Sequence, residues 1–239
     1  FTIIPDSNFE QKLINLGYDD FINGQVLKSN INNITNLDVT SSGISDLTGI
    51  EDFISLITLD CSNNNLNSLD LIQNPNLTSL NCWSNQLNIL DVSQNPNLTS
   101  LNCSGNILSS LDVSQNLNLT SLNCFGNSLL NLDLRQNSNL SYVLCRNNLL
   151  ANLDLRNGNT TNIGYFDSRN NDSLFCISVD DSTYSVNNWT NIDSHTSFSE
   201  NCSQYTLIPD SIFEQRLIDL GYDTIHNGHY EWCLSLIHI

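Results

Sequence analysis

The chain has 239 residues, of which only 13% are charged, and its 25 acidic and 7 basic residues give a formal net charge of −18. Such a chain lacks the basic patches that bind nucleic acid or anionic membrane surfaces, and no apolar run is long enough to cross a bilayer. Because the sequence begins at Phe1 and contains no methionine, we expect a fragment or a processed form, and the lack of a visible signal peptide excludes no compartment.

Residues 1–33 predict an N-terminal helical cap. Ser7 and Glu10 have the spacing of a capping box, in which each side chain bonds a free backbone amide at the helix start. Phe9, Leu13 and Leu16 fall on one apolar face, and Gly17 suits a left-handed C-terminal cap. A stack of coils needs such a lid because its first coil has no neighbour on one side.

Residues 34–176 predict an array of repeats. After a first coil that begins at Ile34 and ends before Leu56, a 21-residue unit recurs with leucines, an asparagine and one cysteine in fixed positions. The cysteines are Cys61, Cys82, Cys103, Cys124 and Cys145. A fixed period predicts a stack of identical structural units. Each unit has two alternating apolar–polar segments and no helical stretch, so we predict a β-rich leucine-rich-repeat solenoid with two short parallel strands per coil.

Residues 177–204 leave the repeat and predict a C-terminal cap. Cys176 and Cys202 bracket this segment and are out of phase with the cysteine column. We predict that they form a disulfide, which favours an oxidising compartment. Two unpaired thiols are the alternative.

Two further segments follow the predicted C-terminal cap. Residues 205–229 repeat residues 1–25 with an offset of 204, so residues 205–233 predict the start of a second cap and array, which is truncated. Residues 234–239 read Leu-Ser-Leu-Ile-His-Ile, which the transposon end used in DNA library preparation encodes. We expect this hexapeptide to be an adapter artefact; a short genuine apolar strand is the alternative.

The repeat resembles two known classes of leucine-rich repeat. The first coil is similar to the internalin-type repeat, and the 21-residue coils are similar to the nested class of bacterial repeats. The segment 173–202 resembles the closing cap of secreted bacterial proteins that carry such arrays. The resemblance covers residues 1–229 and implies an extracytoplasmic binding or adhesion module, in a family whose members are often exported by type IX secretion.

Two columns of side chains raise the question of metal binding. Stacked cysteines about 4.8 Å apart with parallel side chains neither reach disulfide geometry nor converge on a tetrahedral metal. We expect them to be buried as small apolar groups. The second column consists of Asp70, Asp91, Asp112, Asp133 and Asp154. Hydrogen bonds within each turn are the expected role of these carboxylates, and a loosely held ladder of calcium ions is the alternative.

Large side chains interrupt a sheet face that otherwise carries serine, threonine and asparagine. The position after each cysteine reads Ser62, Trp83, Ser104, Phe125 and Arg146, and Tyr142 points outward on the same face. Exposed aromatic and arginine side chains are favoured as binding anchors. We predict a binding site formed by Trp83, Phe125, Tyr142 and Arg146; simple packing over smaller neighbours is the alternative.

No catalytic constellation is visible, since no nucleophile is paired with a base and no phosphate loop or metal cluster occurs. The sequence therefore predicts a non-catalytic, extracellular or cell-surface module that binds a protein or a glycan and needs no cofactor. A passive spacer or stalk is the first alternative, and the targeting arm of a larger secreted enzyme is the second.

Overall fold

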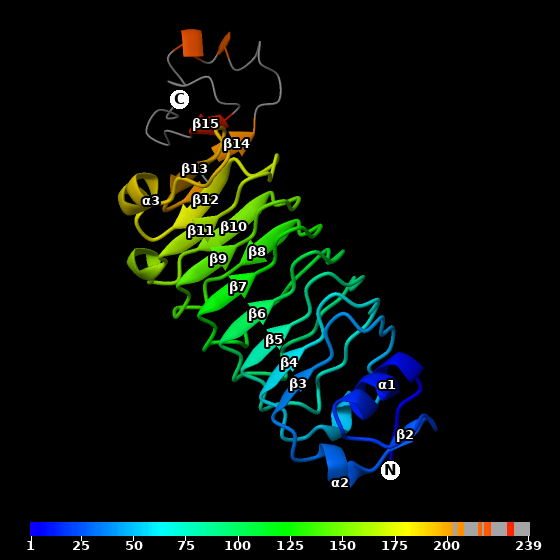
Figure 1. Cartoon of the computed structure of the whole chain (residues 1–239). Coiled ribbons are helices and arrows are strands. Elements are labelled where there is room, and N and C mark those ends of the chain that lie inside the picture. Colours follow the sequence, from blue (N-terminus) through cyan, green and yellow to red (C-terminus); the bar gives the residue numbers. More distant parts are fainter. Residues whose placement is uncertain (203–204, 208–214, 217, 221–228, 232–239) are drawn as a thin grey trace.

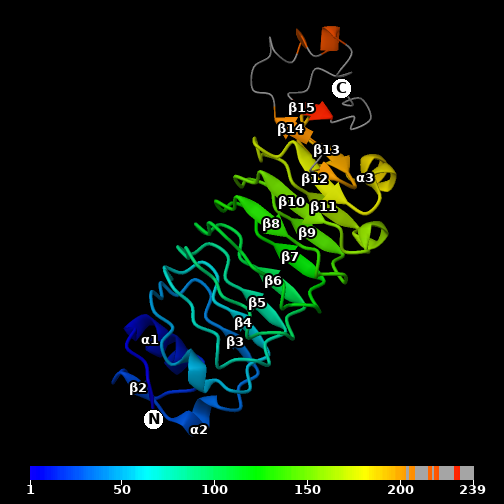
Figure 2. The ribbon, with the colours of Figure 1, turned by 180° about the vertical axis from the view of Figure 1, so that it is seen from behind.

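The computed structural model describes residues 1–202, 205–207, 215–216, 218–220 and 229–231. Within residues 1–202 the chain is an elongated stack of coils, with α1 at one end and α3 beside the other, as opposite views agree (Figures 1 and 2). In this range the helices are α1 (Ser7–Asn15), α2 (Lys28–Ile31) and α3 (Ser182–Asn188), with 3-10 turns at Ile50–Asp52 and Thr160–Asn162. The chain is a leucine-rich-repeat solenoid, as its periodicity predicts.

The first half of each coil contributes one strand to a seven-stranded parallel sheet. Its order is β11-β9-β7-β6-β5-β4-β3. The strands are β3 (Asn36–Asp38), β4 (Thr58–Asp60), β5 (Ser79–Asn81), β6 (Ser100–Asn102), β7 (Ser121–Asn123), β9 (Tyr142–Leu144) and β11 (Tyr165–Asp167). The central residue of each strand is buried, and the register places it beside its counterpart, such as Leu101 beside Leu80 and Leu122.

The second half of the coils forms a sheet only towards the C-terminal end. β8 (Asn131–Asp133), β10 (Asn152–Leu155), β12 (Cys176–Val179) and β13 (Ser197–Ser199) pair in parallel in the order β13-β12-β10-β8. The prediction of two strands per coil is wrong for the earlier coils, because the segments around residues 70, 91 and 112 are not in a strand. In these coils buried asparagine side chains join the second halves: Nδ2 of Asn95, for example, donates to the carbonyls of Leu71 (3.1 Å) and Asn74 (3.0 Å).

A continuous apolar core runs from Ile4 in the cap to Phe198 in β13. Two columns of asparagine line it. Asn106 represents the first: its Oδ1 accepts the Leu87 N–H (3.0 Å), and its Nδ2 donates to the carbonyls of Cys82 and Cys103 (3.0 Å each). The second column, absent from the sequence-based predictions, is fully buried and consists of Asn74, Asn95, Asn116 and Asn137. These amides bond backbone groups that no strand pairs, which polar backbone inside a core requires.

Asp6, and not Ser7, is the N-cap residue of helix α1. Its Oδ1 accepts the backbone N–H groups of Asn8 (2.8 Å) and Phe9 (3.1 Å), as an N-cap residue does. Its Oδ2 accepts the backbone N–H (2.7 Å) and the hydroxyl (2.8 Å) of Ser45. Burial raises the pKa of Asp6, but these hydrogen bonds outweigh it, so the pKa lies below its usual value. One carboxylate therefore caps the helix and joins it to the first coil.

Glu10 does not take part in a capping box, and that prediction is wrong. Its side chain is buried, and Oε1 accepts the backbone N–H groups of Asn23 (2.8 Å), Gly24 (2.7 Å) and Gln25 (3.0 Å). These three residues form the turn into β2 (Gln25–Val26), which pairs antiparallel with β1 (Thr2–Ile3). The carboxylate therefore holds this turn against the helix.

The segment after the repeats extends the second sheet by a further strand. β13 pairs with β12, and a disulfide joins Cys176 of β12 to Cys202, with their Cα atoms 5.7 Å apart. Trp189, which follows α3, stacks on Phe166 at 4.6 Å between ring centroids. Aromatic rings thus cover the last coil of the core.

The described part of residues 205–231 repeats features of the N-terminal cap. β14 (Tyr205–Leu207) and β15 (His229–Glu231) pair antiparallel with Thr206 opposite Tyr230, which is the register of β1 and β2 after the offset of 204. The bond from Gln215 Nε2 to Asp219 Oδ1 likewise corresponds to that from Gln11 to Asn15. The rest of the predicted second cap, and the predicted adapter residues 234–239, lie outside the described residues.

Candidate functional site

The strand face is defined here as the outward side of the seven-stranded sheet. Three columns of side chains cross it. The first contains Asn36, Thr58, Ser79, Ser100, Ser121, Tyr142 and Tyr165. The second contains Asp38, Asp60, Asn81, Asn102, Asn123, Leu144 and Asp167. The third, two residues further along each coil, contains Thr40, Ser62, Trp83, Ser104, Phe125, Arg146 and Arg169.

Side chains of the second column hold the backbone of the third column in place through a hydrogen bond that recurs from coil to coil. In six of the seven coils, an aspartate or asparagine oxygen accepts the backbone N–H of the residue two positions on. Asn102 does this for Ser104 (3.2 Å), and Asp167 does it for Arg169 (3.2 Å). Leu144 has no acceptor, so the coil that carries Arg146 is the exception.

The structure brings two of the predicted residues into direct contact. The guanidinium carbon of Arg146 lies 4.8 Å from the centre of the Phe125 ring, within the range of a cation–π interaction. Arg146 Nε lies 3.9 Å from Oδ2 of Asp167, whose side chain is only 1% exposed. Burial raises the pKa of Asp167, but the hydrogen bonds from Arg169 outweigh it, so the pKa stays below its usual value and the carboxylate is charged.

Tyr142 stacks on a residue that the sequence did not single out. Its ring lies 4.9 Å from that of Tyr165, with an angle of 11° between the planes. Burial first, and then Tyr165 and Asp167, raise the pKa of the Tyr142 hydroxyl, so the phenol is protonated at neutral pH and can donate a hydrogen bond. Tyr165, Asp167 and Arg169 therefore belong to the same surface as Phe125, Tyr142 and Arg146, and we call these six residues the aromatic–arginine patch.

Trp83 lies apart from this patch. It is 42% exposed on the coil of β5, and β6 with Ser104 separates it from Phe125 on the coil of β7. Two strand spacings are about 10 Å, a separation that still lies within the width of one bound partner. The structure thus supports one patch of contiguous side chains and one isolated tryptophan.

The sequence missed Tyr165 because the coil spacing changes there. Tyr142 pairs with Ser121 and Tyr165 pairs with Tyr142, so the offset in residue number rises from 21 to 23. This longer connection hides the alignment from a strict 21-residue frame. A signal did exist, because Tyr165-Phe166 matches Tyr142-Val143 once the frame is shifted.

The aspartate column has the hydrogen bonds expected of turn residues. The Oδ1 atoms of Asp70, Asp91 and Asp112 accept the backbone N–H two residues on, at 2.8–3.0 Å. Asp133 and Asp154 bond Arg135 and Arg156 in addition. Among the residues that the structure describes, no three His, Cys, Asp or Glu side chains gather as metal ligands. The calcium alternative therefore gains no support from this geometry.

The five column cysteines are free and buried. Burial raises the pKa of each thiol, to about 12 for Cys103, so these thiols are neutral at physiological pH. The position that continues the column in the next coil is Ser168, which is also buried. The column therefore consists of small groups that pack in the core, and it presents no reactive thiolate.

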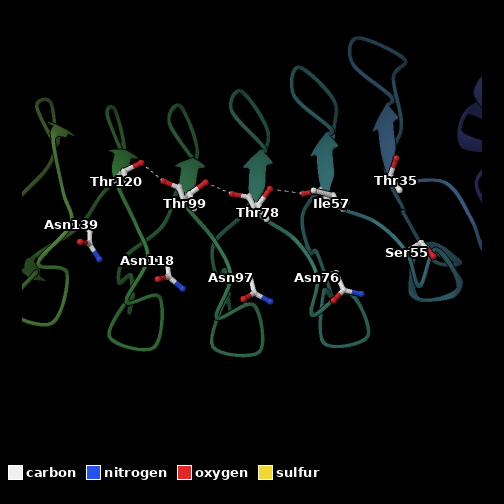
Figure 3. A pocket seen from close by; sticks show the side chains of 10 residues that line it. All are labelled: Thr35, Ser55, Ile57, Asn76, Thr78, Asn97, Thr99, Asn118, Thr120 and Asn139. Atoms are coloured by element: carbon white, nitrogen blue, oxygen red, sulfur yellow. Dashed lines mark hydrogen bonds between the residues drawn. The ribbon is translucent and has the colours of Figure 1, made fainter.

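An open groove of about 890 Å³ runs along the coils beside the start of the strands (Figure 3). Asn97 and its counterparts line one wall, and Thr99 and its counterparts line the other. Nδ2 of Asn97 donates to the Pro75 carbonyl (3.1 Å), and Oγ1 of Thr99 donates to the Thr78 carbonyl (3.0 Å). Each pair of side chains thus bonds the preceding coil, which gives the groove a structural role.

Comparison with solved structures places the fold among bacterial leucine-rich-repeat proteins. An internalin, InlF, of Listeria monocytogenes matches with a TM-score of 0.58 and 20% identity, over 82% of this chain and 56% of its own. A leucine-rich-repeat protein of Leptospira interrogans matches with a TM-score of 0.54 and 21% identity, over 82% and 50%. The functional domain of InlJ of Listeria monocytogenes, which includes a cysteine ladder, is 28% identical over 74% and 50%, with a TM-score of 0.49.

The chain spans about half the length of these structures. No protein-family model and no curated protein sequence matches it. In the described part of the chain, no helix has the length and apolar character needed to span a membrane.

Proposed function

We propose that this leucine-rich-repeat solenoid is a non-catalytic binding or adhesion module that recognises a protein or a glycan through its strand face. The aromatic–arginine patch is the observation that carries the proposal. Its side chains are held by one another: Tyr142 is stacked on Tyr165, and Arg146 lies over Phe125. Because these groups are already ordered, a partner that binds them loses little conformational freedom, which favours affinity.

The location that we propose is extracellular or on the cell surface. The disulfide between Cys176 and Cys202 supports it, because such bonds persist in oxidising compartments. The sequence resemblance further suggests export by type IX secretion. With a net charge of −18, the module is not expected to bind nucleic acid or an anionic membrane surface.

The residues proposed to contact the partner are Trp83, Phe125, Tyr142 and Arg146, and we add Tyr165 because it stacks on Tyr142. Aromatic and arginine side chains dominate the energetics of protein interfaces, and truncation of one at an interface centre typically costs about 2 kcal/mol or more. Trp83 and Phe125 point away from a core that leucine and cysteine already fill. Their replacement should therefore affect binding far more than folding.

The test is a double substitution, Trp83→Ala with Phe125→Ala, beside the control Ser62→Ala with Ser104→Ala in the same column. The immobilised chain is first screened against a display library of peptides and a glycan array, and the best ligand is remeasured by surface plasmon resonance. We expect the aromatic double variant to bind at least about tenfold more weakly, with an unchanged melting temperature. A folded variant with normal binding would place the site elsewhere and favour a passive spacer.

A further inference from the structure

We infer that Arg146 is a carboxylate-binding residue, and that the strand face therefore recognises an aspartate or glutamate side chain of a partner protein. This inference rests on the proposed function and specifies the chemistry of its partner. It depends on a comparison between Arg146 and the three other arginines of the array.

Three of the four arginines are already bound to a carboxylate on their own coil. Their terminal NH2 groups lie 2.5–2.6 Å from an aspartate two residues earlier in the chain: Arg135 with Asp133, Arg156 with Asp154, and Arg169 with Asp167. Arg146 has Leu144 at that position instead. Within the described residues, neither terminal nitrogen of Arg146 has a hydrogen-bond partner, and its Nε atom is buried without one.

The neighbours of Arg146 hold its head group in place without using its terminal nitrogens. Phe125 supports one face of the guanidinium, and Asp167 lies 3.9 Å from Nε, the nitrogen nearest the main chain. The oxygens of Asp167 accept Nε (3.0 Å) and NH2 (2.6 Å) of Arg169, whereas Arg146 Nε stays at 3.9 Å, beyond hydrogen-bond distance. The two terminal nitrogens of Arg146 are therefore free, and their parallel N–H groups match the two oxygens of a carboxylate.

The local charge also favours an anion. Arg146, Arg169 and Asp167 together carry one net positive charge, which the charge of Asp193 near Arg169 partly offsets, in a chain whose total is −18. An acidic partner is repelled by the chain as a whole and attracted at this point, so the arginine contributes to specificity and register more than to the rate of encounter. The second column places the uncharged Leu144 in this coil, so it adds no negative charge beside Arg146.

The aromatic rings of the patch favour a protein over a glycan. A sugar binds by stacking on the open face of an aromatic ring. In the patch, Tyr142 and Tyr165 cover one face of each other, and Arg146 covers one face of Phe125. Each ring therefore keeps at most one face for a sugar, whereas ring edges and tyrosine hydroxyls can pack against side chains and bond peptide groups.

The substitution Leu144→Asp tests this inference without removing the arginine. It places an aspartate two residues before Arg146, as Asp167 stands before Arg169, so the Arg146 guanidinium should bind this new carboxylate instead of a partner's. Arg146→Gln removes the charge directly. The matched control is Arg156→Gln, which changes the net charge equally at another place. Arg156 lies in the second half of a coil and already pairs with Asp154.

The probe is a phage-displayed library of random heptapeptides, panned against the immobilised chain. We expect the enriched peptides to contain aspartate or glutamate. The best peptide, and a version with Asn or Gln in place of its acidic residue, are then titrated calorimetrically against the unsubstituted protein and the three variants. Relative to the unsubstituted protein, Arg146→Gln and Leu144→Asp should each lower the affinity for the acidic peptide about tenfold or more, while Arg156→Gln should change that affinity less than twofold. The neutral peptide should bind all four proteins equally weakly, because the coupling requires both charges.

Several results would overturn the inference. Enrichment of neutral peptides, no enrichment of any peptide, or equal binding by Arg146→Gln would each show that no carboxylate is recognised here. If binding instead depends on Trp83 and Phe125 but not on Arg146, the strand face is still the binding site, and only the inference that Arg146 binds a carboxylate is refuted. If the glycan array alone gives a ligand, the partner is not a protein.

Discussion

Replacing Asn106 with alanine should lower the free energy of unfolding by about 2–4 kcal/mol. The backbone N–H of Leu87 loses its partner, the Oδ1 of Asn106, and remains buried. The carbonyls of Cys82 and Cys103 each lose one bond, although Asn85 and Asn127 still donate to them. A buried donor without a partner costs about 1–3 kcal/mol, and the small cavity and the bonds lost by the carbonyls of Cys82, Cys103 and Ser104 add to that.

The control is Asn97→Ala, which removes an exposed asparagine from the neighbouring coil. Its Nδ2 makes one bond, to the Pro75 carbonyl at 3.1 Å, and water can replace that bond. We expect a loss below about 1 kcal/mol. Urea unfolding followed by circular dichroism measures both variants, and hydrogen exchange at the Leu87 amide reports the local effect. If Asn106→Ala costs no more than Asn97→Ala, the buried asparagine column does not stabilise the solenoid as argued.

Two further predictions concern the core and the cap. In native, oxidised protein, an alkylating reagent at pH 8 should leave all five column thiols unmodified, because they are buried and burial keeps the pKa of Cys103 near 12. Mass mapping of the same sample should find Cys176 joined to Cys202. Rapid labelling of Cys103 without denaturant would contradict its burial. Glu10→Ala should leave the N–H groups of Asn23, Gly24 and Gln25 without their acceptor and lower the free energy of unfolding by about 2–4 kcal/mol. Hydrogen exchange in residues 23–26 should become faster. Ser7→Ala is the control and should have little effect; equal effects of the two substitutions would support the capping box instead.

The sequence by itself determined the repeating part of this protein. A strict 21-residue period determines which side chains stack, and the burial of Leu101 and Cys103 follows from alternation along β6 and the residue after it. It also fixed which face carries Trp83 and Phe125, because a strand turns successive side chains to opposite sides.

Only the tertiary structure decided what individual side chains bond. Glu10 has the spacing of a capping box, yet it binds a turn 13 residues away, because chain folding brings three free N–H groups to it. Tyr165 reaches Tyr142 across a coil that is longer than the regular repeat. The terminal nitrogens of Arg146 have no partner because Leu144 stands where the other arginines have an aspartate, and Asp167 bonds Arg169. The period sets positions along the stack, whereas hydrogen bonds depend on which donors and acceptors neighbouring coils leave unpaired, and that competition is settled only in three dimensions.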